Sequence, residues 1–268
     1  MNCKIVVACH KPCDVPSSEL YIPVHVGSEG KESFGYVTDN TGENISSKNP
    51  VFCELTGLYW AWKNLDYDHL GLVHYRRYFT LKNKSYRRQH GELASVLTVE
   101  ECENLLKRYD IVVPKKRHYY IETLYSHYSH TFSEDHLRIT RDIIQMLFPE
   151  YLDSFDKTMQ QRSAYIFNMF IMPKKLTDDY FSWLFPILFE LEKNIDISNL
   201  TPFEARYAGR ISERLFNVWL NKRIADGTIN RNSIGEIPYL YVGKIDWSRK
   251  IKSFLAAKLF NKKYEESF

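Results

Sequence analysis

The chain has 268 residues, of which 44% are hydrophobic, so it can form the core of one large domain or of a domain with a helical extension. Its formal net charge of +3 is too small to indicate a nucleic-acid partner by itself, and its five irregularly spaced cysteines argue against a disulfide framework. They include no CxxC pair for structural zinc, and no apolar segment has the length of a signal peptide or a transmembrane helix. These features predict a reduced, cytoplasmic protein.

Short apolar runs and longer amphipathic segments alternate along the chain. Runs rich in β-branched residues predict buried strands, and Pro23 places the second strand at a sheet edge. In chain order the prediction is strand 4–9, strand 21–27, polar loop 39–49, helix 50–64, strand 70–73, exposed loop 82–94, helix 98–108, strand 110–114, helix 133–147, strand 164–172, and helices 177–192 and 202–223. This alternation is typical of an α/β fold with a mostly parallel sheet.

The last part of the chain has a different pattern. Residues 247–263 carry apolar side chains on one helical face and lysine or arginine on much of the rest. Such a basic amphipathic helix either binds an anionic membrane surface or packs on its own domain with a solvated basic face. We therefore divide the chain into a catalytic or binding domain, residues 1–243, and a basic C-terminal helix or tail, residues 244–268.

Basic residues follow three of the predicted strands. His10 and Lys11 follow the first strand, His74 to Arg77 follow strand 70–73, and residues 115–118 follow strand 110–114. Ligands of open α/β sheets bind beyond the carboxyl ends of the strands, and arginine forks suit phosphate oxygens. The chain has neither a GxxxxGK loop nor a GxGxxG turn. A nucleotide-sugar diphosphate held by side chains fits this pattern.

Asp66 and Asp68 form an Asp-x-Asp pair that resembles the metal-binding element of many sugar transferases. Here the pair precedes strand 70–73, so its carboxylates lie at the amino end and point away from the expected site. We interpret the pair as a solvated turn and expect no metal or other cofactor. Arg76 and Arg77 can instead neutralise a leaving diphosphate.

Several segments resemble a bacterial glycosyltransferase family that was long catalogued as a domain of unknown function. They are ACHKP, YIPVHVG, DNTGENIS, NPVFCELTGLYWAWKN, GLVHYRRYF, FNMFIM, WLFPILFELE and ERLFNVWL, spread over residues 4–222. The family occurs in capsule, exopolysaccharide and O-antigen gene clusters. The resemblance implies a GT-A-like nucleotide-diphospho-sugar fold and transfer of a sugar to a growing glycan. Some members are associated with galactofuranosyl transfer, so UDP-galactofuranose or another UDP-hexose is the expected donor.

Candidate donor-binding residues follow from the strand ends and the polar loop. His10 and Lys11 are expected to border the nucleotide. Asp39 and Asn44 are expected to touch ribose or sugar. The full set of predicted donor-binding residues is His10, Lys11, Asp39, Asn44, His74, Arg76 and Arg77.

The acceptor side needs a sugar contact and, for an inverting transferase, a carboxylate base. Asn168 interrupts an apolar run at the place where transferases of this fold present an asparagine to the sugar. Glu213 is the expected base and Asp135 the alternative, although Asp135 is also explained by the dipole of its helix. Further predicted sugar or acceptor contacts are Tyr125, His127 and Arg210.

Three functions remain open at this point. The favoured one is a glycosyltransferase, metal-independent and inverting, that acts on a lipid-linked acceptor at the inner face of the cytoplasmic membrane. The first alternative is a non-catalytic module that binds a sugar nucleotide or a glycan. The second is a nucleic-acid-binding protein, which the modest net charge disfavours.

Overall fold

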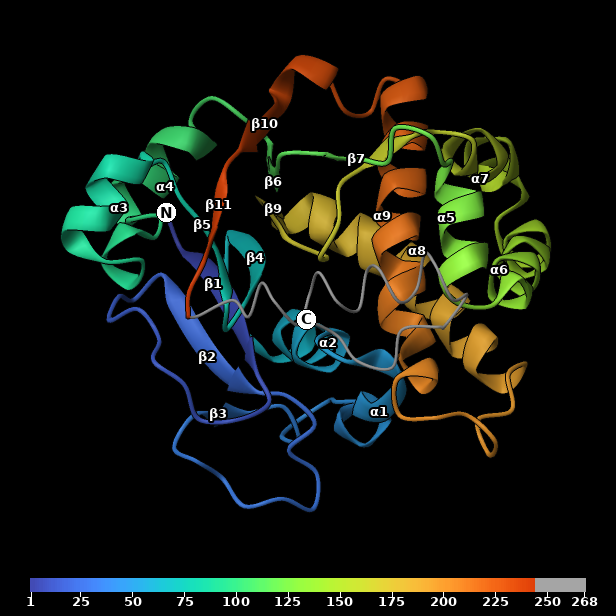
Figure 1. Cartoon of the computed structure of the whole chain (residues 1–268), viewed down its shortest axis with the longest axis horizontal. Helices are drawn as coiled ribbons and strands as arrows, with labels where there is room; N and C mark the ends of the chain where they lie inside the picture. Colours follow the sequence, from blue (N-terminus) through green and yellow to red (C-terminus); the bar gives the residue numbers. More distant parts are fainter. Residues whose placement is uncertain (244–268) are drawn as a thin grey trace.

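The computed structural model describes residues 1–243, which form a mixed, mostly parallel β-sheet flanked by helices (Figure 1). The order across the sheet is β10-β6-β9-β4-β1-β2-β3, and β5 and β11 extend it as a side branch. Its strands are β1 (Cys3–Cys9), β2 (Tyr21–His25), β3 (Val37–Thr38), β4 (His69–His74), β5 (Arg77–Phe79), β6 (Ile111–Pro114), β9 (Phe170–Pro173), β10 (Ile234–Ile237) and β11 (Tyr239–Tyr241). A separate two-stranded sheet contains β7 (Arg117–His118) and β8 (Ser163–Ala164).

One strand in the middle of the sheet runs opposite to both of its neighbours. Strand β9 lies antiparallel between β4 and β6, whereas β1 pairs in parallel with both β2 and β4. The amino end of β9 therefore lies at the edge where β1, β4 and β6 end. This edge collects the segments that leave three strands and the segment that enters a fourth.

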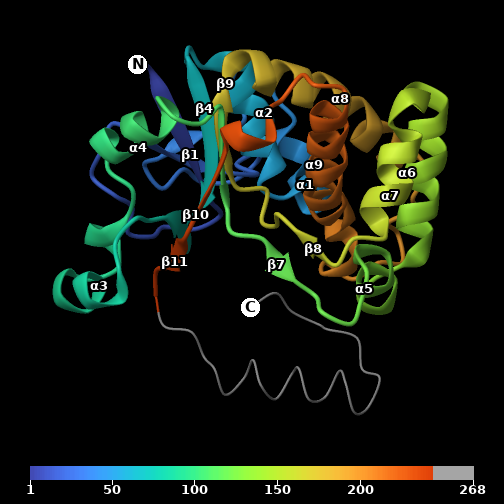
Figure 2. The same cartoon turned by 90° about the horizontal axis from the view of Figure 1, so that it is seen from above.

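Helices cover both faces of the sheet (Figure 2). Helix α4 lies on one face, and α2, α8 and α9 lie on the other, with α5, α6 and α7 in an outer layer beyond α8 and α9. The helices are α1 (Asn49–Phe52), α2 (Leu55–Asn64), α3 (Lys84–His90), α4 (Val99–Leu106), α5 (Leu124–Thr131), α6 (Glu134–Leu147), α7 (Leu152–Met159), α8 (Lys174–Lys193) and α9 (Tyr207–Ala225). Short 3-10 turns are η1 (Ser46–Lys48), η2 (Leu93–Ser95), η3 (Pro149–Tyr151), η4 (Glu204–Arg206) and η5 (Arg231–Ser233).

Strand β1 shows why the sheet forms in the interior. Val6 and Ala8 belong to the core under α2, α8 and α9, whereas Ile5 and Val7 belong to the smaller core under α4. Successive side chains of a strand point to opposite faces, so an unbroken apolar run is buried on both. This confirms the α/β fold and the buried first strand expected from the sequence.

Three predicted elements differ in the structure. The predicted helix 50–64 is two helices, because the backbone at Cys53 is left-handed with φ of 53°. The predicted strand 164–172 is β8 and β9 with an irregular turn between them, so Asn168 precedes a strand instead of interrupting one. The predicted loop 82–94 contains α3, whose first turn is capped by the Asn83 side chain and whose end is at Gly91 with φ of 85°.

The proline in β2 predicted that this strand lies at the edge of the sheet. In the structure the edge strand is the short β3, which pairs with β2. The β3 partners are Val24 and His25, and Pro23 lies just before this pairing begins. Within residues 1–243 no helix has both the length and the apolar character needed to cross a bilayer. The predicted tail at 244–268, including its amphipathic helix, lies outside the described residues.

Candidate active site

The edge where β1 and β4 end and β9 begins holds the candidate active site. Parallel pairing aligns Ala8 of β1 with His74 of β4, so the segments that follow leave the sheet side by side. Antiparallel pairing aligns Leu72 of β4 with Phe170 of β9, so the residues just before Phe170 reach the same edge. The elements therefore bring together residues that are far apart in the sequence.

A group of basic side chains lies around the ring of Tyr75 at this edge. The His10 ring lies 4.9 Å from it, Lys11 Nζ 5.7 Å and Arg76 Cζ 5.1 Å, measured to the ring centroid. Burial lowers the pKa of His10, and the charges of Lys11 and Arg206 lower it further, so the imidazole is neutral at pH 7. Positive charge from two strand ends is thus concentrated where an anionic ligand can reach it.

Arg206 joins this basic group from η4, just ahead of α9. Its Nε donates a hydrogen bond to Cys53 Sγ at 3.2 Å. Burial raises the pKa of the Cys53 thiol to about 11, so the sulfur is a neutral thiol and does not cancel the guanidinium charge. Glu54 and Tyr75 also interact electrostatically with Arg206. Arg206 therefore connects the cations around Tyr75 with the carboxylate of Glu54.

Three non-glycine residues at this edge have left-handed backbone conformations. The φ angles are 53° at Cys53, 72° at Phe167 and 54° at Asn168. Such conformations cost on the order of 1–3 kcal/mol each and persist only where the surroundings enforce them. At the Phe167–Asn168 turn, contacts from three other elements enforce the conformation.

Phe167 is held by contacts from β4, α9 and the β4–β5 hairpin. The backbone N–H of Phe167 donates to Glu213 Oε1 at 3.1 Å, and His74 Nε2 donates to the Phe167 carbonyl at 2.6 Å. Burial lowers the pKa of His74, so the ring is neutral and uses its Nε2 proton for this bond. Arg77 Cζ lies 4.4 Å from the centroid of the Phe167 ring. The HYRRYF hairpin thus positions the turn as well as the cations.

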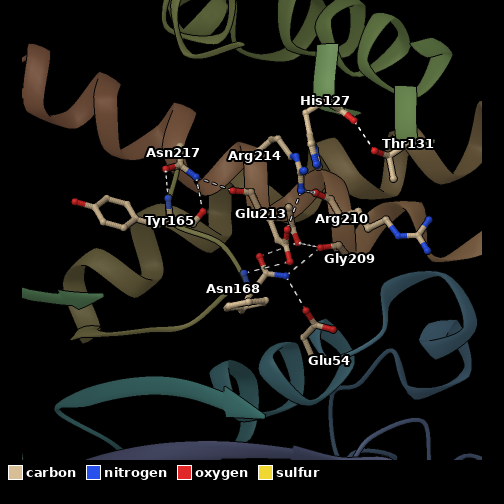
Figure 3. Close-up of polar contacts among 12 residues, drawn as sticks. Glu54, His127, Thr131, Tyr165, Asn168, Gly209, Arg210, Glu213, Arg214 and Asn217 are labelled. Carbon is tan, nitrogen blue, oxygen red and sulfur yellow. Dashed lines mark hydrogen bonds and ion pairs between the residues drawn. The ribbon is translucent and has the colours of Figure 1, made fainter. Parts of the chain in front are cut away.

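Asn168 connects the start of α2 with α9 (Figure 3). Its Nδ2 donates to Glu54 Oε1 at 2.8 Å and to the Gly209 carbonyl at 3.0 Å, and its Oδ1 accepts from Ser212 Oγ at 3.0 Å. The residue is only 5% exposed. Its predicted contact with a sugar stays a prediction, and in this structure the amide orients Glu54.

Glu213 is half-buried, and both of its carboxylate oxygens accept hydrogen bonds. Oε1 accepts from the Phe167 N–H, and Oε2 accepts from Arg214 Nη1 at 2.7 Å. His127 of α5 lies beside Arg214 in Figure 3, and burial, followed by the Arg214 charge, lowers the pKa of His127 to about 4. The imidazole is therefore neutral at pH 7. The roles of Glu213 and His127 in the reaction stay predictions.

Arg210 lies between two aromatic rings one turn of α9 before Arg214. Its Cζ is 4.0 Å from the centroids of both Phe132 and Phe203, and Nη2 donates to the Phe203 carbonyl at 2.6 Å. Burial lowers the pKa of Arg210 to about 10, which leaves it charged at neutral pH. The Nη1 group is buried and has no hydrogen-bond partner among the described residues.

Two other candidates lie away from this cluster. Asp135, in the first turn of α6, is exposed and pairs with Arg138 at 2.9 Å. The Tyr125 hydroxyl donates to Glu134 Oε1 at 2.6 Å. The Tyr125 bond links α5 to α6, and the Asp135 ion pair lies within α6. Neither residue contacts the groups gathered around Tyr75 and Phe167.

Asp39 organises the polar loop from inside. Its fully buried carboxylate accepts from the N–H groups of Gly27 and Ser28, at 2.7 and 3.0 Å, and from the hydroxyls of Ser28 and Ser46. Asn44 Oδ1 accepts from the Ser46 N–H at 3.2 Å. These bonds give Asp39 a structural role, and its contact with ribose stays a prediction.

The Asp-x-Asp pair lies at the amino end of β4, as its position in the sequence predicted. Asp68 Oδ2 accepts from the Asn2 N–H at 2.8 Å, and Asn2 Nδ2 donates to the Asp66 carbonyl at 2.9 Å. This is the edge opposite the basic group. Across residues 1–243, no cluster of three or more His, Cys, Asp and Glu side chains has the arrangement of a metal site.

The third predicted basic segment leaves β6 at the same edge but makes different contacts. Lys116 Nζ lies 4.8 Å from the centroid of the Tyr165 ring, and Arg117 Cζ lies 5.1 Å from that of Tyr119. The basic group around Tyr75 therefore draws on β1, β4 and η4 instead. Strand β9 separates β6 from β4, and the sequence carried no indication of this insertion.

Sequence reasoning missed Glu54 and Arg206. Glu54 follows the break at Cys53, inside what the apolar spacing predicted as one helix. Arg206 lies in a helical segment whose orientation depends on packing. A cysteine–glutamate pair between two helical turns carries no strong motif, so only the folded backbone reveals it.

Comparisons with known proteins add two findings. Residues 4–224 match the model of a family described as a domain of unknown function, DUF4422. The chain is also similar to the solved apo structure of WbbM, described as a bifunctional glycosyltransferase, with a TM-score of 0.81 and 31% identity. This similarity covers 91% of the chain but 46% of the WbbM chain, so the chain spans less than half of that protein. A comparison with curated proteins finds no match.

Replacing Asp39 separates its structural role from a binding role. Asp39→Ala leaves the N–H groups of Gly27 and Ser28 and the Ser46 hydroxyl without their buried acceptor. We expect it to lower the free energy of unfolding by about 3 kcal/mol or more, measured by chemical denaturation. Asp39→Asn keeps the shape of the side chain and should lower the free energy of unfolding by less. A stable Asp39→Ala protein that fails to bind nucleotide sugar would instead support the ribose contact.

Proposed function

The chain belongs to the DUF4422 family, and we propose that it is a glycosyltransferase that uses a nucleotide-diphospho-sugar donor. The observation that carries the proposal is the group of His10, Lys11, Arg76 and Arg206 at one sheet edge, beside the carboxylate of Glu54. The Phe167–Asn168 turn links this carboxylate to that of Glu213. The similarity to half of a bifunctional glycosyltransferase supports the same reaction class. Each feature alone fits several functions, and together they favour sugar transfer.

The basic group is suited to the diphosphate of the donor. Arginine presents planar pairs of N–H groups that match phosphate oxygens, and a fixed positive charge stabilises a leaving diphosphate. In the proposal Arg76 and Arg77 perform this role without a divalent metal ion. His10 and Lys11 border the nucleotide, and the donor is UDP-galactofuranose or another UDP-hexose.

The carboxylates are suited to the acceptor side. An inverting transfer needs a base that takes the proton of the attacking hydroxyl as the bond to the sugar forms. We keep Glu213 as the proposed base. Glu54 competes for this role, because the described hydrogen bonds use one of its oxygens whereas both oxygens of Glu213 are engaged. The acceptor is proposed to be a lipid-linked glycan of a capsule, exopolysaccharide or O-antigen.

A non-catalytic sugar-nucleotide-binding module is the second candidate. Its supporting observation is that the Phe167 N–H and Arg214 already donate to both Glu213 oxygens, which leaves neither oxygen without a partner for an acceptor hydroxyl. Donor hydrolysis without acceptor separates the two functions. A chain that binds UDP but never turns over a donor is a binding module.

Replacing Arg76 tests the role of the basic group. Arg76→Ala should lower the rate of sugar transfer by about a hundredfold or more, because a charge that stabilises the leaving diphosphate is lost. Arg76→Lys keeps the charge but not the paired N–H groups, so its transfer rate should lie between those of the wild type and Arg76→Ala. The exposed Arg88 of α3 provides the matched control, Arg88→Ala, which should keep full activity. Wild-type rates in a folded Arg76→Ala protein would remove Arg76 from the mechanism.

Replacing the carboxylates identifies the base. Glu213→Gln should lower the transfer rate by about 10²- to 10⁴-fold while donor binding changes little. It should also lower the unfolding midpoint, because the ion pair with the buried Arg214 is lost. Glu54→Gln should have the smaller effect, and Asp135→Asn should have none. Titration calorimetry with UDP and thermal unfolding accompany each rate. If Glu54→Gln shows the larger loss, the base is Glu54.

Chelation tests the proposed independence from metal. Sugar transfer should continue at an unchanged rate in excess EDTA, because side-chain cations take the place of a divalent ion. The control is a metal-dependent glycosyltransferase assayed in the same buffer. Inhibition by EDTA that Mn²⁺ reverses would contradict this part of the proposal.

A further inference from the structure

The loop between β7 and α5 exposes two adjacent apolar side chains. Tyr120 is 80% exposed and Ile121 is 83% exposed. No other large apolar side chain in residues 1–243 is as exposed as either of them. Exposed single hydrophobic residues are ordinary, but an adjacent pair at a loop tip calls for a physical explanation.

The backbone of this loop is fixed in a way that presents both side chains outward. Tyr119 N donates to the Arg162 carbonyl at 2.8 Å, and Arg162 Nη1 donates to the Tyr120 carbonyl at 3.0 Å. Tyr120 has φ of 57°, a conformation uncommon for an aromatic residue. Tyr119 packs inward, 4.4 Å from the His127 ring, so its two neighbours are left at the surface. Hydrogen bonds and packing thus fix the conformation of the loop tip.

Basic side chains lie beside the tip and on the segment that leads to it: Arg162 donates to the Tyr120 carbonyl, and Arg117 lies over the Tyr119 ring. Strand β7 pairs with β8, which brings Arg162 next to Tyr119, at the end of the segment 115–118. None of the ion pairs within the part of the chain that the structure describes uses Lys115, Lys116, Arg117 or Arg162. The nearby carboxylate of Glu122 is paired with His130 at 2.8 Å. The surface therefore combines an apolar tip with cations that form no ion pair with a carboxylate of residues 1–243.

We infer that this surface, which we call the Tyr120 loop, binds an anionic membrane surface. Tyrosine is favoured at the membrane–water boundary, where its ring contacts the acyl region and its hydroxyl stays hydrated. Ile121 enters the same layer, and the surrounding cations attract anionic lipid head groups. Charge complementarity favours this partner over a neutral glycan or an apolar protein groove.

The position of the Tyr120 loop gives the contact a consequence for the active site. The loop follows β6, whose carboxyl end lies at the same sheet edge as those of β1 and β4. Figure 2 shows β7 and the segment leading to α5 on the same side of the molecule as β11. A membrane bound there lies at the sheet edge that carries the candidate site, where a lipid-linked acceptor would be presented to it. Only this orientation rests on the proposed function, because the lipid contact itself requires no catalysis.

Vesicle sedimentation with the full chain tests the inference without an activity assay. The wild-type chain should bind phosphatidylcholine vesicles that contain phosphatidylglycerol and bind pure phosphatidylcholine vesicles more weakly. Tyr120→Ser combined with Ile121→Ser should weaken binding by about tenfold or more, because the inserted apolar surface is lost. Lys115→Gln combined with Arg117→Gln should weaken binding to the anionic vesicles alone, by about fivefold for each lost charge.

Two further variants make the test decisive. Met146 and Leu147 are also adjacent and exposed, at the end of α6, so their double replacement by serine is the matched control and should leave binding unchanged. Ile121→Trp should strengthen binding, because tryptophan favours the membrane interface. Wild-type binding in the Tyr120→Ser/Ile121→Ser chain would assign the membrane contact to another segment and overturn the inference. Absence of vesicle binding by the wild-type chain would overturn it too, and would leave a glycan or protein as the partner.

Discussion

The turn formed by Phe167 and Asn168 is the constraint on which the candidate active site depends. Both residues have left-handed backbones, which cost on the order of 1–3 kcal/mol each. Hydrogen bonds to charged groups, worth about 1.5–3 kcal/mol each, offset this cost at Glu213 and Glu54. A neutral His74 adds a bond from β4. The turn therefore fixes the relative positions of α2, β4 and α9, and with them the two carboxylates.

The antiparallel direction of β9 makes this arrangement possible. An antiparallel strand between β4 and β6 starts where its neighbours end, so the turn that precedes it faces the segments that follow β1 and β4. The cations around Tyr75 and the carboxylates near Phe167 then meet at one edge. Arg76 contacts Tyr75 and the Tyr241 hydroxyl, so aromatic groups position its charge without neutralising it. An arginine positioned in this way keeps its charge available to bind a phosphate.

Much of this edge could be predicted from the sequence, for identifiable reasons. The apolar runs of β1 and β4 are local signals, and so are the His10 and Arg76 segments that follow them. The location of the Asp-x-Asp pair before β4 also follows directly from strand direction. The Phe167–Asn168 turn could not be predicted, because its apolar sequence looks like a strand and its conformation depends on bonds from other elements. Glu54 was hidden for the same reason, since the break at Cys53 is imposed by tertiary contacts.

The central claim is that the basic group around Tyr75 binds the diphosphate of a nucleotide sugar. The most direct measurement is thermal unfolding of the chain with a panel of nucleotide sugars, because a ligand that binds only the native state raises the melting temperature. A UDP-hexose should raise the melting temperature by several degrees, free hexose and uridine should not, and Arg76→Ala should abolish the shift. A panel in which no nucleotide-diphospho-sugar changes the melting temperature, or an undiminished shift in Arg76→Ala, would contradict the account.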